Sequence, residues 1–247
     1  MKISTFNICG WYSAINKGLG KWIKNSNIDI LALQELRTVN VAKPLELAKY
    51  FTAFNPSKFQ GTAIISTNKP LKIKRKLGYA RLDSEGRFIQ ADFKNFIFLN
   101  VYLPHGGRDK KDLPYKLKSF ELLIKYLVKL KKERKPIILA GDFNVAHTEK
   151  DLANPERNKN NIMFTEKERR QIDKILELDF VDSFRQLHKT GGYTWWLRAF
   201  DAKKRNIGWR IDYVFISKNL TESLYNAFVE KNLEISDHCP LVVETRI

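Results

Sequence analysis

The amino-acid sequence predicts an α/β or α+β layered sandwich, and three observations support this fold class. Short apolar runs typical of strands recur along the whole chain, and amphipathic helical patterns lie between them. The 247 residues, 43% of them hydrophobic, are enough to build a large core. No Pro-, Gly- or Ser-rich linker divides the chain, so we expect a single domain over residues 1–247.

The expected strands are short runs of apolar residues, most of them bounded by turn-forming residues. In chain order they are Lys2–Ile8, Ile28–Gln34, Thr62–Ser66, Arg87–Phe93, Phe96–Tyr102, Pro136–Ala140, Ile211–Ile216 and Leu241–Thr245. The run Pro136–Ala140 is apolar throughout, as in a strand that is buried on both faces. We expect Gly141 to end it.

Two helices are predicted most clearly. The first spans about Leu113 to Lys132, where apolar residues recur at helical spacing and lysines occupy the other face. The second spans about Thr165 to Leu178, and its first residues, Thr-Glu-Lys-Glu, form a capping box. Strands and helices interspersed in one domain predict packed layers rather than a helical bundle or an all-β fold.

The net charge of +17, from 44 basic and 27 acidic residues, indicates a polyanionic partner, because bound Lys and Arg release counterions from phosphates. A general enrichment in lysine is the alternative, since 30 of the 44 are Lys. Two cysteines exclude a disulfide framework and favour a reducing setting. No segment resembles a signal peptide or is long enough to span a bilayer, so we expect a cytoplasmic protein (nucleoid-associated in a prokaryote) without a membrane partner.

Polar side chains stand at the ends of the expected strands. They are Asn7, Gln34, Glu35, Tyr102, Asp142, Asn144, Asp212, Asp237 and His238. Asp142 and Asn144 lie two residues apart, so an extended segment would point both side chains to the same side. Each residue taken alone could be an ordinary cap or turn former. Taken together, they predict one edge of the sandwich that carries carboxylates, amides, a tyrosine and a histidine.

This set of side chains favours metal-assisted phosphoester hydrolysis. Carboxylate and amide oxygens suit hard cations, Mg²⁺ first and Mn²⁺ as an alternative. Such an ion stabilises charge on a phosphoryl oxygen while an oriented water attacks in line. An Asp–His pair can contact a phosphate or move a proton. The sequence contains no Gly-x-Ser-x-Gly elbow, P-loop or Cys/His zinc spacing.

The chain resembles the exonuclease III / apurinic-apyrimidinic endonuclease family, within the endonuclease–exonuclease–phosphatase superfamily. The matching motifs run in family order from residue 7 to residue 240. They are Ser4-Thr-Phe-Asn7, Leu33-Gln-Glu35, Asn100-Val-Tyr-Leu-Pro104, Gly141-Asp-Phe-Asn-Val-Ala-His147, Asn206-Ile-Gly-Trp-Arg-Ile-Asp-Tyr213 and Ser236-Asp-His-Cys-Pro240. Gly-Asp-x-Asn and Ser-Asp-His are shared across the superfamily, whereas Gly-Trp-Arg-x-Asp-Tyr and the Asp151–Asn161 stretch indicate the DNA-repair branch.

The resemblance implies a four-layer sandwich of two packed mixed sheets between helices. It also implies a Mg²⁺-dependent monomer that cuts double-stranded DNA 5′ to abasic sites and trims blocked 3′ ends as an exonuclease, phosphatase or phosphodiesterase. Glu35 would be the main metal ligand, with Asp237 nearby. Asp142 would orient or deprotonate the attacking water, held by Asn7 and Asn144. The remaining catalytic residues implied are His238, oriented by Asp212, and Tyr102, both against the scissile phosphate.

For the substrate, the resemblance implies a pocket for the flipped-out sugar lined by Trp209 and Trp195. Aromatic residues interleaved with cations, among them Arg210 and Lys203-Lys-Arg205, suit stacking beside phosphates. Arg108 matches an arginine that reaches the duplex beside the lesion. Asn158 and Asn161 fall on family positions in a loop near the site, with Asn161 the stronger candidate of the two.

Two positions depart from the family pattern. Cys9 stands where relatives carry Asp or Asn beside the metal, and a neutral thiol is a poor ligand for Mg²⁺. A small buried filler is the interpretation we favour for it, and weaker Mg²⁺ affinity is the alternative. His105 stands where some relatives carry Asn near the phosphate, and it keeps a hydrogen-bond donor there.

Two other functions remain open at this point. One is a different phosphoesterase of the superfamily, acting on RNA, a phosphoinositide or a sphingolipid head group. The other is a catalytically silent DNA-binding relative. The silent alternative requires a lost catalytic residue, and only Cys9 offers such a loss.

Overall fold

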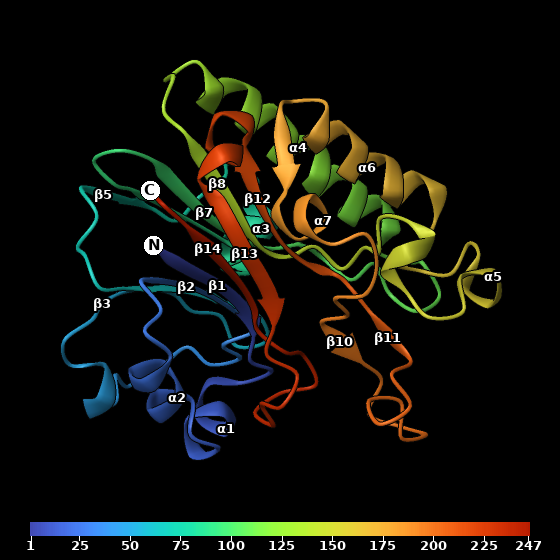
Figure 1. Cartoon of the computed structure of the whole chain (residues 1–247), viewed down its shortest axis with the longest axis horizontal. Helices are drawn as coiled ribbons and strands as arrows, with labels where there is room; N and C mark the ends of the chain where they lie inside the picture. The colour runs from blue at the N-terminus through green and yellow to red at the C-terminus, as the bar shows by residue number, and fades with distance from the viewer.

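Two six-stranded mixed sheets pack face to face in the computed structural model, which describes residues 1–247 (Figure 1). The first sheet has the order β13-β14-β1-β2-β4-β3. Its strands are β1 (Lys2–Asn7), β2 (Ile30–Gln34), β3 (Phe51–Asn55), β4 (Thr62–Ser66), β13 (Leu224–Val229) and β14 (Leu241–Thr245). Within it β1 and β2 are parallel and the other pairs are antiparallel.

The second sheet repeats this plan with the order β5-β6-β7-β8-β12-β9. Its strands are β5 (Lys72–Lys74), β6 (Phe88–Asp92), β7 (Ile97–Tyr102), β8 (Ile137–Asp142), β9 (Phe180–Asp182) and β12 (Asp212–Ser217). Here β7 and β8 form the parallel pair. The eight strands expected from the sequence are all present, and β3, β5, β9 and β13 are additional. A two-stranded ribbon of β10 (Trp195–Trp196) and β11 (Gly208–Trp209) stands apart from both sheets.

Helices cover the outer face of each sheet, so the predicted four-layer sandwich is confirmed (Figure 1). They are α1 (Trp11–Asn16), α2 (Leu19–Ser26), α3 (Ala80–Ser84), α4 (Leu113–Lys131), α5 (Pro155–Asn158), α6 (Glu166–Leu176) and α7 (Ser183–Leu187). Three 3₁₀ turns lie at Leu45–Leu47, Glu149–Asp151 and Lys218–Ser223. Both long helices fall where the sequence predicts them, and the Thr165–Glu168 capping box is present. No helix is both long and apolar enough to cross a bilayer.

Three apolar cores hold these layers together. The central core fills the space between the sheets and includes Ile3, Ala32, Phe98 and Val214. A second core joins α4 and α6 to the second sheet, and a third joins α1 and α2 to the first sheet. Because each sheet is buried on both faces, its central strands are apolar almost throughout, as Pro136–Ala140 predicted.

Strand register places three polar residues side by side at one edge of the second sheet. Tyr102 at the end of β7 pairs with Asp142 at the end of β8, and Asp142 pairs with Asp212 at the start of β12. Asn7, at the end of β1, lies on the facing sheet and reaches across to Asp142. The hydrogen bonds that pair the strands join backbone groups only, and this pairing determines where the polar side chains meet.

The expectation that Gly141 ends the central strand is wrong. β8 continues through Gly141 to Asp142 and pairs with a neighbour on each side. The glycine is required for another reason: its φ is 152°, and a Cβ there would lie 2.0 Å from the carbonyl oxygen of Val101. Any other residue would push β7 and β8 apart directly before the catalytic edge.

Candidate active site

The centre of the candidate site is a buried triad of Asp142, Asp212 and His238. One ligand-forming atom from each lies within 4.8 Å of the others. His238 Nδ1 lies 2.9 Å from Asp212 Oδ2, which fixes the imidazole and leaves Nε2 free. Asp142 accepts hydrogen bonds from Asn7 Nδ2 at 2.9 Å and from the backbone N–H of Asn144 at 2.8 Å.

Burial and mutual charge set the protonation of this triad. Burial, followed by the charge of Asp212, raises the pKa of Asp142 to about 7. Burial acts to lower the pKa of His238, but Asp212 and then Asp142 outweigh it and raise that pKa to about 10. At neutral pH, therefore, His238 is an imidazolium that can hold an anion, and Asp142 titrates in the range that suits proton transfer.

A second acidic group, Glu35, lies directly beside the triad. Its Oε1 accepts hydrogen bonds from Asn7 Nδ2 at 3.0 Å and from Tyr102 OH at 2.7 Å. The single amide of Asn7 therefore links Glu35 on the first sheet with Asp142 on the second. Burial and the neighbouring Glu35 raise the pKa of Tyr102 well above its usual value, so the phenol stays protonated and acts as a donor.

Asp237 is half-buried and accepts hydrogen bonds from three side chains, among them the hydroxyl of Ser236 at 3.2 Å. Its Oδ1 accepts from Arg198 at 3.0 Å, and its Oδ2 accepts from the indole N–H of Trp195 at 3.3 Å. Glu35 is likewise paired with an arginine, through a contact between Oε2 and Arg37. The thiol of Cys9 lies among these four charged groups.

The donor set fits a hard divalent cation. Asp212 Oδ1 is a buried acceptor without a partner, Glu35 Oε2 is buried and contacts only Arg37, and the surrounding groups offer carboxylate oxygens rather than thiolate or clustered imidazoles. Glu35 and Asp237 are the predicted metal ligands, yet the tightest group of ligand-forming atoms is the triad. Arg37 contacts Oε2 of Glu35 and Arg198 contacts Oδ1 of Asp237, so one oxygen of each carboxylate already has a guanidinium beside it.

The two tryptophans of the predicted lesion pocket face each other across the β10–β11 ribbon. Trp195 pairs with Trp209, and Trp195 also forms an isolated bridge with His238. Trp209 packs beside Phe164 and Met163, so one side of its indole is supported by the loop before α6. The ribbon therefore places the Trp195 ring next to the imidazole of the triad, with a ring-centroid distance of 6.4 Å from Trp195 to His238, and Trp209 stands opposite Trp195 on the ribbon.

Two local expectations are wrong. Asn144 is not in an extended segment: its φ is 53°, its own N–H donates to Asp142, and its side chain donates to the carbonyl of Leu103 at 3.0 Å. This is an Asx turn, in which the carboxylate caps the backbone that follows it. Arg210 is not beside the pocket either: it is fully buried and lies 2.7 Å from both Asp151 and Asp182.

Of the remaining predicted substrate residues, Arg108 and Asn161 lie on loops and Asn158 is the last residue of α5. Arg108 is exposed and is free of ion pairs. Asn158 is half-buried and donates to the carbonyls of Ala153 and Asn154, and Asn161 is exposed and donates to Asn158. His105 is exposed. None of these side chains contacts the triad.

Sequence patterns missed a buried ion pair that supports the site from below. Lys116 and Glu168 are both fully buried and in contact. Lys116 Nζ also donates to the carbonyls of Asn144 at 2.7 Å and His105 at 3.1 Å, and Glu168 accepts the N–H groups of Met163 and Thr165. This ion pair therefore holds in place the three loops that contain His105, Asn144 and Met163. Arg37 and Arg198 were missed as well, because a lone arginine on a loop carries no sequence pattern.

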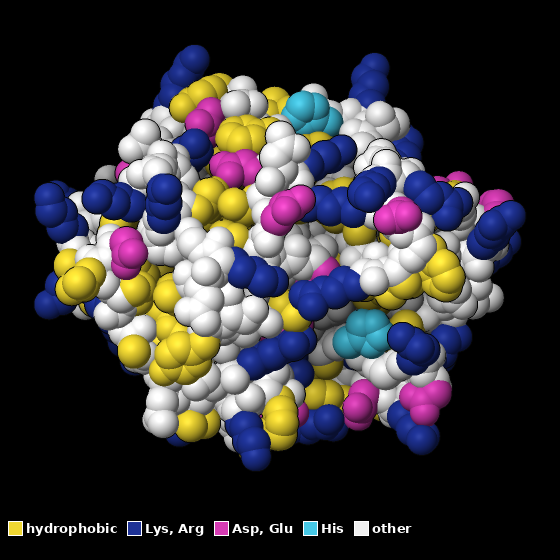
Figure 2. Space-filling model, turned by 90° about the horizontal axis from the view of Figure 1, so that it is seen from below, with side chains coloured by type: hydrophobic (Ala, Val, Ile, Leu, Met, Phe, Trp, Pro, Cys, Tyr) yellow, Lys and Arg dark blue, Asp and Glu magenta, His cyan; other side chains and the backbone are white.

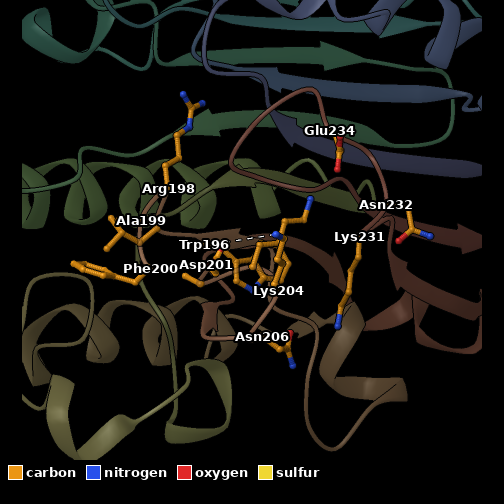
Figure 3. Close-up of a pocket in the computed structure, with 13 residues that line it drawn as sticks. Trp196, Arg198, Ala199, Phe200, Asp201, Lys204, Asn206, Lys231, Asn232 and Glu234 are labelled. Atoms are coloured by element: carbon orange, nitrogen blue, oxygen red, sulfur yellow. Dashed lines mark ion pairs between the residues drawn. The ribbon is translucent and has the colours of Figure 1, made fainter.

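Cationic side chains are spread over the face that carries the ribbon, as Figure 2 shows in dark blue. A cavity of about 820 Å³ is formed by residues of the loop 196–206 and residues 231–234 (Figure 3). None of the triad residues lines it. On this loop Phe200 is 80% exposed and Lys204 points into solvent, so an apolar and a cationic group are both available to a partner.

The fold and this site define a hydrolase of phosphodiester bonds, and the chain belongs to the endonuclease/exonuclease/phosphatase family, whose model matches residues 5–238. It is 36% identical over 247 residues to an exodeoxyribonuclease of Bacillus subtilis, an alignment that covers 98% of each chain. It is 37% identical over 253 residues to the DNA-(apurinic or apyrimidinic site) endonuclease of Dictyostelium discoideum, covering 98% of this chain and 70% of that one.

A solved structure supports the same assignment. The structure of an AP endonuclease from Archaeoglobus fulgidus superimposes on the whole chain with a TM-score of 0.93 at 32% identity, and 100% of both chains is covered. The family and the fold predicted from the sequence are therefore confirmed, as is the prediction of a phosphodiester hydrolase.

Proposed function

We propose that this protein is a DNA-repair nuclease that cleaves the DNA backbone 5′ to abasic sites and also removes nucleotides or blocking groups from 3′ ends. The observation that carries the proposal is the alignment of Tyr102, Asp142 and Asp212 by strand register, with His238 held on Asp212. The substrate follows from the relatives, one an exodeoxyribonuclease and two of them endonucleases for apurinic or apyrimidinic sites.

The buried triad suits in-line attack on a phosphodiester. Asp142, with a pKa of about 7, accepts the proton of the attacking water, and Asn7 and the Asn144 N–H hold its carboxylate in place. His238, an imidazolium at neutral pH, directs Nε2 at a phosphoryl oxygen and stabilises the charge that develops there. Tyr102 remains protonated and donates a hydrogen bond.

Glu35 would hold the divalent ion, Mg²⁺ or Mn²⁺, and Asp237 would lie close to it. When bound, the ion supplies positive charge that offsets charge on the phosphoryl oxygens of the transition state. Asn7 donates to the carboxylates of both Glu35 and Asp142. It therefore holds the ion ligand and the proton acceptor in a fixed position relative to each other. The burial of the Glu35 carboxylate, whose Oε2 is contacted by Arg37 alone, supports this assignment.

The Trp195–Trp209 ribbon would receive the sugar that has lost its base. A nucleotide without a base has lost most of its stacking energy, so it leaves the duplex at low cost and fits a pocket walled by indoles. Arg108 and Asn161, on exposed loops, and Asn158, at the end of α5, would contact the duplex. We place the enzyme inside the cell, as a monomer acting on double-stranded DNA, and its two free cysteines agree with a reducing compartment.

The test is an incision assay with a labelled duplex that contains one abasic analogue. It is run with Mg²⁺, with Mn²⁺ and with chelator, beside an intact duplex and a duplex with a 3′ phosphate. We expect one metal-dependent cut 5′ to the lesion, release of the 3′ phosphate, and loss of both in Asp142→Ala. Tight duplex binding without a cut would indicate the silent relative. Neither cutting nor binding would indicate a phosphoesterase for another substrate.

A further inference from the structure

Two arginines cover the two carboxylates that are the best candidates for metal ligands. Arg37 contacts Glu35, and Arg198 lies 3.0 Å from Asp237. The exposure of the partners is unequal: the side chains of Arg37 and Arg198 are 47% and 60% exposed, whereas those of Glu35 and Asp237 are 11% and 19% exposed. Each guanidinium therefore lies on the solvent side of its carboxylate and can leave without disturbing the core.

Both ion pairs belong to one cluster, because the thiol of Cys9 lies within the electrostatic reach of all four groups. The cluster here contains two negative and two positive side chains, so its net charge is zero, and an entering divalent cation meets both guanidinium groups.

The surroundings of Arg198 offer it a second anionic partner. A cavity of about 330 Å³ lies against Asp237 and is lined in part by Arg198, Lys17 and Lys203. In Figure 3 the Arg198 side chain points away from Phe200 and Lys204 on its own loop. Arginine pairs well with phosphate oxygens through its planar fork of donors. A DNA phosphate in this cavity would therefore compete with Asp237 for Arg198.

We propose that Arg37 and Arg198 hold Glu35 and Asp237 while the protein is free and transfer to DNA phosphates when a duplex binds, so that DNA and the divalent ion bind cooperatively. This inference rests on the proposed function. Linkage makes the coupling reciprocal: DNA tightens ion binding by the same factor by which the ion tightens DNA binding. In the bound complex the two arginines are positioning residues: they hold DNA phosphates and leave the carboxylates of Glu35 and Asp237 free to bind the ion.

The test measures Mn²⁺ binding to the full chain by electron paramagnetic resonance. It uses free protein and protein saturated with an abasic-analogue duplex that carries a cleavage-resistant phosphorothioate at the 5′ linkage. We expect Arg198→Gln and Arg37→Gln to bind Mn²⁺ about tenfold more tightly than the wild type when DNA is absent, because one repelling charge is gone. We expect the duplex to raise the Mn²⁺ affinity of the wild type about tenfold, and to raise that of each variant by a smaller factor.

Arg170→Gln is the matched control, since Arg170 is 55% exposed and is paired with Glu177 at 2.8 Å on α6, away from the site. Its Mn²⁺ affinity should equal that of the wild type. Equal Mn²⁺ affinities of wild type, Arg37→Gln and Arg198→Gln without DNA would overturn the inference, and so would a wild-type affinity that the duplex leaves unchanged. If either of these results is obtained while incision is normal, the cooperative binding is wrong and the proposed function stands. If incision is absent while Arg37→Gln and Arg198→Gln still bind Mn²⁺ more tightly than the wild type in free protein, the proposed function is wrong.

Discussion

The active site contains two acidic centres that differ in burial and in partners. The triad of Asp142, Asp212 and His238 is buried, lies on strand ends, and is joined by hydrogen bonds to both sheets. The centre of Glu35, Asp237 and Cys9 lies nearer the surface, and exposed arginines pair with its carboxylates. The first is set by the fold before any ligand arrives, and the second changes partners when a ligand binds.

The difference shows how one fold separates two requirements of hydrolysis. Proton transfer and charge stabilisation need fixed geometry, which a strand register supplies at no cost in reorganisation. Binding of an ion and of DNA needs groups that are available in the free protein, and exposed side chains provide that. The two centres also differ in backbone conformation: Cys9, Glu35 and Arg37 all have φ between 50° and 58°, whereas no member of the triad has a positive φ.

The largest effect is expected from breaking the buried centre. In Asp212→Asn the imidazole of His238 loses its anionic partner and is largely neutral at pH 7, so it no longer stabilises a phosphoryl oxygen as a cation. We expect incision to fall by about 10²- to 10⁴-fold, measured as kcat at saturating Mg²⁺. Asp179→Asn, which changes an exposed aspartate paired with Lys131, is the control and should remain at the wild-type rate. A rate for Asp212→Asn within threefold of the wild type would mean that the triad is structural.

A smaller effect is expected from adding charge to the second centre. Cys9→Asp places a carboxylate among Glu35 and Asp237, and we expect Mn²⁺ affinity of the free protein to rise about tenfold. The φ of Cys9 is 52°, a conformation that Asp and Asn adopt more readily than Cys, so the backbone should accept the change. Cys9→Asn keeps this shape without the charge and should bind Mn²⁺ as the wild type does. Equal affinity in all three proteins would show that residue 9 does not face the ion.

The last effect is on stability rather than on activity or binding, and it concerns the triad in metal-free protein. Because the pKa of His238 is raised to about 10, the folded protein holds a proton that the unfolded chain releases near pH 6.5. This contribution to stability is complete below pH 6.5 and is lost as pH rises towards 10. Between pH 7.5 and 9.5 the free energy of unfolding should fall by at most about 1.4 kcal/mol per pH unit more in the wild type than in His238→Asn.

The measurement is urea unfolding in chelator at several pH values for both proteins. In the wild type the pKa of Asp142, about 7, lies below this window. In His238→Asn the lost imidazolium charge raises the pKa of Asp142, which makes the difference between the two proteins smaller than the upper limit given above. The charged side chains that raise the pKa of His238 are Asp212, Asp142 and Asp237, and all three are present in both proteins. Parallel pH profiles for the two proteins would contradict the raised pKa of His238.

Much of the fold could be predicted from the sequence, because its strands are buried on both faces and leave an apolar pattern. All eight expected strands form, and the Thr165 capping box appears where a local motif predicts it. Strands without that pattern were missed: Lys72–Lys74 alternates exposed and half-buried residues, and Trp195–Trp196 and Gly208–Trp209 are only two residues long. Their pairing depends on partners distant in the sequence.

The sequence by itself determined the fold class, the family and the polar residues from which the site is built, because strand ends and short motifs are local features. Only the tertiary structure decided how these residues act. Register across β7, β8 and β12 brings Tyr102, Asp142 and Asp212 together, and sheet packing places Asn7 between Glu35 and Asp142. It also buried Arg210 and brought Arg198 to Asp237. Charge and burial depend on neighbours from distant segments, and only the folded chain provides those neighbours.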